Sequence, residues 1–373
     1  MKKIIFICHS AYRKGNPFDP NFGITFGFLN HYLKKDGYSA IRHSIIKGGE
    51  SRIYKNGGED SYFKIPFLGS LPDSIRYVGE LISTFLFLLL NKPITVIAID
   101  PLSCLVPSLL WKIGYIKKCF FITPDFAIQR FNNKILNKIY FAIDRFCTFN
   151  SDKNIVCSKT VIEYKQKIYN APKDLFFHMP NIPNPWIIEN FLNIPKIKNR
   201  IIYVGNISNQ INFLEIFDAF EKVKVKFPNL SLVIVGGGRM EEKLRRIVEE
   251  RGLKDLFFLG QLSYEQTLLE IAKSEIGIAI YNGSFNYDEF RDSCKIREYQ
   301  ALNVIPITTK IVKANAEEIT KYQSGLILRD DDDFSEILSF IIDKKGHTFK
   351  INMQNNNSIY NTKYLDFFKL ITK

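Results

Sequence analysis

Short apolar runs alternate with segments of helical spacing along the whole chain. Runs of four to eight apolar residues bounded by polar residues predict buried strands, and apolar positions recurring every three or four residues predict amphipathic helices. In the first half the predicted strands are 3–8, 94–99, 119–122 and 154–157. The predicted helices there are 24–35, 102–113 and 133–146. Strands that alternate with helices favour a mostly parallel sheet with helices on both faces.

The second half restarts the same pattern after residues 179–185, a segment with three prolines that breaks any regular element. Its predicted strands are 200–204, 231–235, 256–259, 276–281 and 326–328. Its predicted helices are 212–227, 240–251, 264–273, 334–342 and, after an Asn-rich loop at 352–361, the final helix 360–370.

We therefore expect an α/β protein of two doubly wound, Rossmann-like domains. The N-terminal domain covers 1–180, the C-terminal domain covers 181–358, and the last helix, in 359–373, returns to the first domain. Ligands of such sheets bind at the carboxyl ends of the strands, so the expected site is a cleft between the domains.

Charge is distributed unevenly between the two halves. The net charge is +13, and residues 1–185 carry 25 Lys and Arg against 13 Asp and Glu, which is +12. A basic face attracts nucleic acid, anionic lipid or an anionic substrate. Two domains without a recognition helix or RNA motif argue against nucleic acid.

The spacing of the cysteines and the length of the apolar runs exclude several classes of protein. The six Cys are scattered without a C-x-x-C pair, which fits a reducing cytosol and argues against a disulfide framework and a zinc site. No signal peptide is visible, and the longest apolar run, 81–90, is too short to span a bilayer. The expected location is the cytoplasm or a membrane surface.

The richest segment for chemistry is 291–309. A loop with Asp292 and Ser293 leads into a short helix, on which Lys295 and Glu298 share one face. A helix N-terminus binds anions such as a diphosphate, while a surface ion pair on an ordinary helix is the alternative.

This segment resembles the donor site of GT-B glycosyltransferases, especially family 4, with the pattern Ser-x-x-Lys-x-x-Glu-Tyr-x-Ala. The resemblance implies a nucleoside diphosphate sugar as donor, with Glu298 on the ribose and Ser293, Asp292 and Lys295 near the phosphates and sugar. It implies no required metal or cofactor.

Other donor positions follow from the same resemblance. Gly205, Gly236 and Tyr281 lie at the ends of strands and are expected beside the donor, and 257–260 is where the backbone meets the base. The family pattern has an Arg directly after the glycine and a Lys six residues later. This chain has Asn206 and Asn212 there, and Phe290 near the place of a first Glu, where Asp288 or Asp292 could substitute.

The acceptor side is expected in the first domain. A family subset is similar to the stretch from Asp125 through Arg130 to Tyr140. Asp125 and His9, both at the carboxyl ends of predicted strands, are the candidate catalytic groups. Ser10, Gly23 and Arg130 are the other acceptor-side candidates. A helix cap is the alternative role of Asp125, and packing that of His9.

Aromatic and basic residues are mixed in 111–118 and along the helix from Arg130 to Arg145, which suits an anionic membrane surface. The sequence thus predicts a glycosyltransferase of surface polysaccharide or glycoconjugate synthesis, retaining, with a glycan acceptor that is lipid-linked. It would be peripheral on the inner face of the membrane. The alternatives are a catalytically silent GT-B scaffold or binding protein, and a GT-B sugar-nucleotide epimerase.

Overall fold

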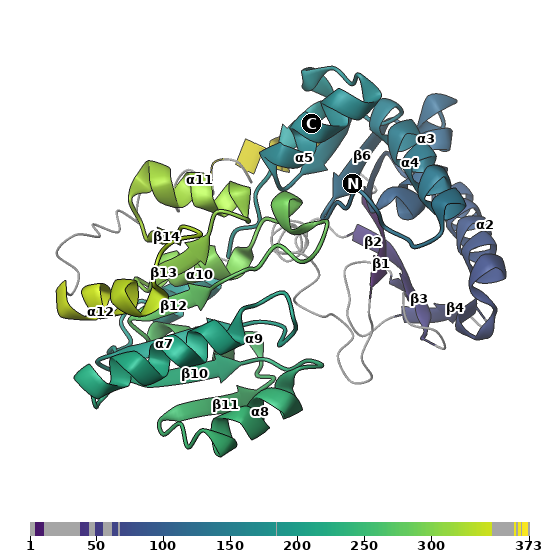
Figure 1. Cartoon of the computed structure of the whole chain (residues 1–373). Helices are drawn as coiled ribbons and strands as arrows, with labels where there is room; N and C mark the ends of the chain where they lie inside the picture. Colours follow the sequence, from purple (N-terminus) through teal and green to yellow (C-terminus); the bar gives the residue numbers. More distant parts are fainter. Residues whose placement is uncertain are drawn as a thin grey trace. The chain divides into compact units, whose positions relative to one another are not determined.

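The computed structural model describes residues 4–10, 38–44, 49–54, 62–65, 68–183, 185–344, 362, 365–366 and 368–371. The chain forms two compact units (Figure 1), one of Met1–Asn181 with Asn361–Lys373 and one of Ile182–Tyr360. Within the described ranges no helix is both long and apolar enough to cross a membrane.

The first unit is built on an eight-stranded sheet in the order β4-β3-β2-β1-β5-β6-β7-β8. From β2 to β8 through β1 the pairs are parallel, while β2–β3 and β3–β4 are antiparallel. The strands are β1 (Ile4–Ser10), β2 (Tyr38–Ser44), β3 (Ser51–Tyr54), β4 (Tyr62–Ile65), β5 (Thr95–Ile99), β6 (Lys118–Thr123), β7 (Lys153–Val156) and β8 (Phe176–His178).

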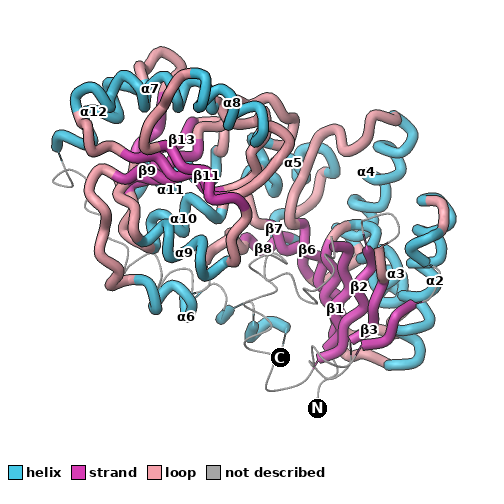
Figure 2. The backbone as a smooth tube through the Cα atoms, turned by 90° about the horizontal axis from the view of Figure 1, so that it is seen from below, coloured by secondary structure: helices cyan, strands magenta, loops and turns pink. Residues whose placement is uncertain are grey.

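Helices α2, α3 and α4 lie together along this sheet (Figure 2) and pack on it through a core of Ile, Val, Phe and Cys side chains. The helices are α2 (Asp73–Asn91), α3 (Pro101–Lys112), α4 (Lys134–Phe149) and α5 (Lys159–Tyr169), with short 3₁₀ turns at Leu68–Ser70 and Lys173–Leu175. The described residues of 362–371 are helical, and Lys118 Nζ donates to the carbonyl of Leu370.

The second unit is built on a six-stranded parallel sheet in the order β11-β10-β9-β12-β13-β14. This is the strand order of the dinucleotide-binding fold. The first three strands extend from β9 to one edge of the sheet and the next three extend from β12 to the other edge, so the strand order reverses between β9 and β12. The strands are β9 (Arg200–Val204), β10 (Ser231–Val235), β11 (Leu256–Gly260), β12 (Ile276–Ala279), β13 (Ile305–Thr309) and β14 (Leu326–Leu328).

Helices cover both faces of this sheet because its strands are apolar on both sides. Odd and even residues of β9 belong to different cores, one with α7, α8 and α12 and the other with α9 and α10. The helices are α6 (Pro185–Ile188), α7 (Phe213–Lys226), α8 (Glu241–Glu250), α9 (Tyr264–Ala272), α10 (Cys294–Ala301), α11 (Lys313–Tyr322) and α12 (Phe334–Lys344), with 3₁₀ turns at Glu189–Phe191 and Asp288–Phe290.

The α/β class expected from the sequence is confirmed, and both units are Rossmann-like. The pattern did not predict the antiparallel pair β3–β4, the strands β2 and β8, or the helices α2, α5 and α11. The predicted helix 24–35 and the Asn-rich loop 352–361 lie outside the described residues.

A buried ion pair fastens α5 to α4 in the first unit. Lys165 Nζ lies 2.8 Å from Asp144 Oδ1, and both side chains are fully buried. Thr123 Oγ1 accepts from the same ammonium, and the Tyr169 hydroxyl donates to the other carboxylate oxygen at 2.8 Å. Because each charge is paired and hydrogen-bonded, removing one partner leaves the other buried without compensation.

We predict that Lys165→Met lowers the free energy of unfolding of the first unit by about 3–5 kcal/mol, the usual cost of a buried charge that loses its partner. Lys159→Met, on an exposed side chain of the same helix, should change it by less than about 0.5 kcal/mol. Denaturant titration measures both, and equal midpoints for the two variants would contradict the prediction.

Candidate functional site

In the second unit, the site candidates gather where the sheet reverses direction. Strands β9 and β12 are neighbours, yet their following helices turn to opposite faces of the sheet. Between the carboxyl ends of two such strands the loops diverge, and this is where open α/β sheets bind ligands. Gly205 directly follows β9, and Tyr281 follows β12 two residues beyond its end.

Lys295 reaches this point from the first turn of α10. A Cβ atom on Gly205 would lie 2.5 Å from Lys295 Nζ, and Gly205 has a φ of +139°, so glycine is required there for two reasons. The ammonium lies 4.7 Å from the ring centroid of Tyr203 and 5.4 Å from that of Tyr281. It forms no ion pair within the described part of the chain, so its charge is available to an anion.

Gly236 brings the loops after β9 and β10 into contact. Its φ is +131°, and a Cβ atom there would lie 2.0 Å from the carbonyl oxygen of Gly205. Its N–H donates to the Gly260 carbonyl at 2.8 Å. A side chain at this position would push the Gly205 loop away from Lys295.

The N-terminus of α10 differs in detail from the expectation. Ser293 is the N-cap residue, but its amide already donates to Asn315 Oδ1 at 2.7 Å and its hydroxyl lies 3.2 Å from that of Tyr281. The next three amides, of Cys294, Lys295 and Ile296, have no acceptor among the residues that the structure describes. The free donors of this helix therefore start one residue after Ser293.

Glu298 is buried on the same helix, one turn after Cys294. Cys294 Sγ lies 3.5 Å from Glu298 Oε1. Burial raises the pKa of the Glu298 carboxyl, and hydrogen bonds from Tyr264 and Cys294 and the charge of Lys295 offset this only in part. A buried carboxylate with spare acceptor capacity suits a ligand hydroxyl.

Asp292 lies beside the site but is engaged in a network of buried charges. Arg297 Nη1 is 2.6 Å from Asp292 Oδ1, and Arg297 Nη2 is 2.8 Å from Glu318 Oε2. This geometry makes Asp292 a support of the loop before α10.

Neither asparagine at the expected cation positions supplies a charge. Asn206 is exposed, and Asn212 Nδ2 donates to Glu215 Oε2 at 2.9 Å. The sequence interpretation missed Arg291, whose guanidinium lies 5.1 Å from the ring centroid of Tyr281. A cation in the loop after the fourth strand was the signal that could have identified it.

In the first unit, His9 lies at the corresponding reversal, between β1 and β5. Its Nε2 is 2.8 Å from Glu80 Oε2, and its Nδ1 is 3.0 Å from Asp100 Oδ2 and 2.8 Å from Ser103 Oγ. Burial lowers the pKa of His9, but the two carboxylates outweigh it and raise the pKa to about 10. Both nitrogens are occupied and the ring is charged at neutral pH, which argues against His9 as a base.

The pKa of a neighbouring histidine, His43, is shifted in the opposite direction. His43 is buried and its Nε2 is 2.9 Å from Thr84 Oγ1. Burial, together with the positive charge of His9, lowers its pKa to about 3. Asp100 adopts a φ of +74°, which is rare for a residue other than glycine, and its side chain caps α3. This strained backbone points to a position held by its charge partners.

Asp125 and Arg130 form a pair on the surface, 2.9 Å apart. Asp125 is 64% exposed as a side chain, so a base there would have no shelter from water. Asn137 accepts from the amides of Arg130 and Phe131, and Asn133 caps α4. The side chains of this segment therefore form hydrogen bonds within the loop that precedes α4. Ser10 ends β1, and nothing is described of its side chain; Gly23 lies outside the described residues.

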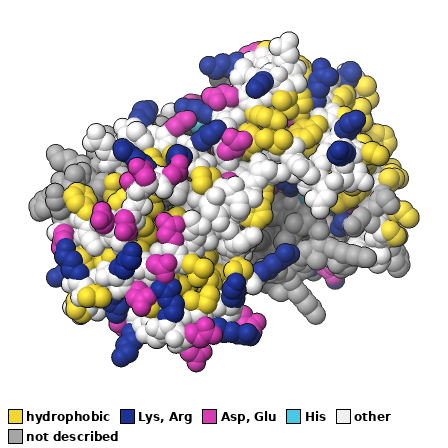
Figure 3. Space-filling model, in the orientation of Figure 1, with side chains coloured by type: hydrophobic (Ala, Val, Ile, Leu, Met, Phe, Trp, Pro, Cys, Tyr) yellow, Lys and Arg dark blue, Asp and Glu magenta, His cyan; other side chains and the backbone are white. Residues whose placement is uncertain are grey.

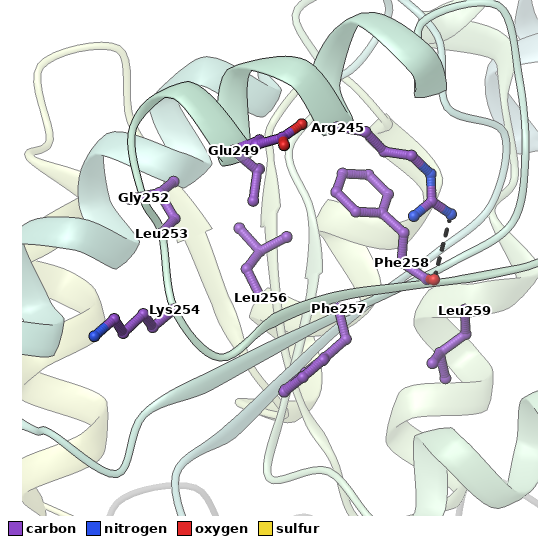
Figure 4. A pocket seen from close by; sticks show the side chains of 10 residues that line it. Arg245, Glu249, Gly252, Leu253, Lys254, Leu256, Phe257, Phe258 and Leu259 are labelled. Carbon is purple, nitrogen blue, oxygen red and sulfur yellow. Dashed lines mark hydrogen bonds between the residues drawn. The ribbon is translucent and has the colours of Figure 1, made fainter.

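A groove of about 560 Å³ runs along the edge strand β11 (Figure 4). It is lined by Phe257, Phe258 and Leu259 of β11 and by Arg245 and Glu249 of α8, and the Phe258 ring points towards Arg245. Gly252, Leu253 and Lys254, which precede the strand, also line the groove. In the described ranges, no group of three His, Cys, Asp or Glu side chains could hold a metal ion.

We predict that His9 stabilises the first unit in a pH-dependent way. Its folded pKa of about 10 exceeds the ordinary value of 6.5, so the stabilisation is complete below pH 6.5 and is lost as the pH rises towards 10. The melting temperatures of the wild type and His9→Gln should therefore converge across this range. A difference between the two that stays constant from pH 6.5 to 10 would contradict the assignment.

A known protein family and several solved structures resemble this chain. Residues 185–358 match the family model of glycosyl transferases group 1. No curated protein sequence matches the chain. Similar solved structures include Anabaena HepE in complex with UDP (12% identity, 100% of both chains, TM-score 0.67) and Thermosynechococcus elongatus sucrose-phosphate synthase (13%, 99% and 98%, 0.71).

A third similar structure is the lipopolysaccharide outer core galactosyltransferase WaaB in its apo form, with 15% identity, 98% of both chains covered and a TM-score of 0.63. At these identities the likeness establishes the fold. The family match covers the unit that contains Gly205, Lys295 and Glu298. The second unit therefore matches the family of glycosyl transferases group 1, and the chain has the GT-B fold.

Proposed function

We propose that the protein transfers a sugar from a nucleoside diphosphate sugar to a hydroxyl of a glycan acceptor, with retention of configuration. The observation that carries the proposal is the ammonium of Lys295 beside Gly205, which has no carboxylate partner among the described residues, next to three amides of α10 that have no acceptor among them. A positive group and a helix N-terminus at one point are what a diphosphate requires.

Each group has a distinct part in this reaction. As the bond to the anomeric carbon breaks, negative charge grows on the diphosphate, and Lys295 with the first turn of α10 stabilises it. Glu298 accepts a hydrogen bond from a ribose hydroxyl and so fixes the donor. Gly205 and Gly236 let the backbone approach the donor closely.

The state of the two candidate bases favours retention. An inverting transfer needs a group that removes the acceptor proton. His9 is a buried cation with both ring nitrogens engaged, and Asp125 is an exposed partner of Arg130. In a retaining reaction the departing diphosphate itself accepts the proton, so no such base is needed.

Surface features of the first unit support a lipid-linked acceptor and a position at the cytoplasmic face of a membrane. Helix α2 exposes one continuous apolar stripe, and the first turns of α4 add another beside Lys134 and Lys138. Figure 3 shows hydrophobic side chains gathered over α2, α3 and α4, with Lys and Arg between them. The exposed apolar residues are Ile75, Tyr77, Val78, Ile82, Phe85, Leu86, Leu90, Leu109, Ile113, Ile135, Leu136 and Ile139.

The acidic residues of this region do not oppose an anionic membrane. Between residues 75 and 149 they are Glu80 and Asp144, which are buried, Asp100, which pairs with His9, and Asp125, which pairs with Arg130. Apolar side chains flanked by exposed lysines such as Lys134 and Lys138 bind the interface of an anionic bilayer. The surface glycoconjugate named for WaaB supports the same class of product.

We predict that one nucleoside diphosphate raises the melting temperature of the wild type, because a ligand that binds only the folded state stabilises it. Glu298→Gln should weaken binding by about 10- to 100-fold, the value of a hydrogen bond to a charged group. Glu250→Gln, exposed on α8, is the control.

Wild-type binding should also weaken as the pH falls towards the raised pKa of Glu298, because the protonated carboxyl accepts less well. Failure of every nucleotide to shift the wild type would refute the proposed function. Equal binding by Glu298→Gln would refute the role of this residue alone.

For the membrane, we predict that the wild type sediments with vesicles that contain anionic lipid. The double change Ile82→Asn and Leu86→Asn should reduce binding by at least about tenfold, since each loses an apolar contact of about 1 kcal/mol or more. The matched control is Leu214→Asn with Val225→Asn, two exposed apolar residues of the second unit. Equal vesicle binding by both double variants would overturn this assignment. So would a wild-type dimer that dissociates in the Ile82→Asn and Leu86→Asn variant but not in the control, because the apolar stripe would then be a dimer interface.

A further inference from the structure

Two cations, rather than one, lie at the ring of Tyr281. The Arg291 guanidinium carbon is 5.1 Å and Lys295 Nζ is 5.4 Å from its centroid, and the ring is buried. Burial raises the pKa of the Tyr281 hydroxyl, but the two cations outweigh it, so the pKa is lower than usual. The ring therefore lies in a strongly positive field, which is unusual for a buried position.

Arg291 is held in place by buried partners. Its Nη2 donates to Gln210 Oε1 at 2.8 Å and to Asp288 Oδ1 at 3.1 Å. Gln210 and Asp288 are both buried, and Arg291 Nε has no acceptor in the described part of the chain. The guanidinium is thus fixed through Nη2, while its Nε–H has no acceptor among the described residues.

The charges at this point do not cancel. Asp288 compensates Arg291, whereas Lys295 has no carboxylate partner among the described residues. Two cations held close together repel one another, and each would be stabilised by an anion between them. The unused amides of α10 open on the same loop.

This arrangement accounts for the absence of cations at positions 206 and 212. Asn206 is exposed, and Asn212 is bonded to Glu215. Asn212 nevertheless adjoins the same place, because its amide donates to the Ile280 carbonyl at 3.2 Å. Positive charge is therefore supplied from the loop before α10 and not from the loop after β9.

We propose that Arg291 binds the diphosphate of the donor together with Lys295, and that Asp288 is the residue that positions it. This inference rests on the proposed function, since it assumes that the site accepts a nucleoside diphosphate. Guanidinium groups suit phosphate oxygens because they offer parallel donors.

The test compares a nucleoside with its diphosphate, using the base that the wild type prefers. Calorimetry on Arg291→Met should show diphosphate affinity reduced by about 10- to 100-fold, as expected for a charge-assisted hydrogen bond. Nucleoside affinity should remain within about twofold, because base and ribose do not meet Arg291. Arg246→Met, an exposed arginine paired with Glu242 on α8, is the control and should match the wild type.

Arg291→Lys keeps the charge and serves as a second variant in case Arg291→Met does not fold. It should retain part of the preference for the diphosphate over the nucleoside. Equal diphosphate affinity in Arg291→Met and the wild type would overturn the inference while leaving the proposed function intact. Equal loss of nucleoside and diphosphate in both variants would also overturn it, by showing a structural role. A wild type that binds no nucleotide would refute the proposed function itself.

Discussion

The position of one ammonium group, that of Lys295, depends on how α10 packs against the sheet. Tyr299 lies over Gly277 of β12, where a Cβ atom would come within 2.3 Å of the ring. Its hydroxyl accepts the amide of Val204 at 3.0 Å, which ties α10 to the end of β9. The helix can therefore approach only because position 277 has no side chain, and Lys295 reaches Gly205 only because the helix approaches.

Much of the second unit could be predicted from the sequence. Its central strands, β9, β10 and β12, are buried on both faces, so they are short continuous apolar runs bounded by polar residues. In the first unit, β3 and β4 are only four residues each and include Arg52 and Lys64, so they lack that pattern. Helix α2 was not predicted at all, because many of its apolar positions face outwards, contrary to the usual helix.

The candidate site could be predicted as far as it is local in the chain. Ser293, Lys295 and Glu298 are neighbours on one helix, and their pattern is sufficient. The chemistry of His9 depends on Glu80 and Asp100, which are 71 and 91 residues away. The contact of Arg291 with Gln210 spans 81 residues. No spacing rule reports such contacts, and they decide which groups are charged, free or engaged.

Helix α2 also has a consequence for how the first unit reaches a single structure. Its inner face bears Arg76, Glu80 and Thr84, which bind the Ser44 carbonyl, His9 and His43. Turning the helix about its axis would bury Ile75, Val78 and Ile82 and gain hydrophobic energy, but would take Glu80 away from His9 and leave buried polar groups without their partners. A few directional polar contacts thus fix the rotation of α2 about its axis, although another rotation would bury more of its apolar side chains. The unit forgoes part of its hydrophobic burial to keep charge at the ends of its strands.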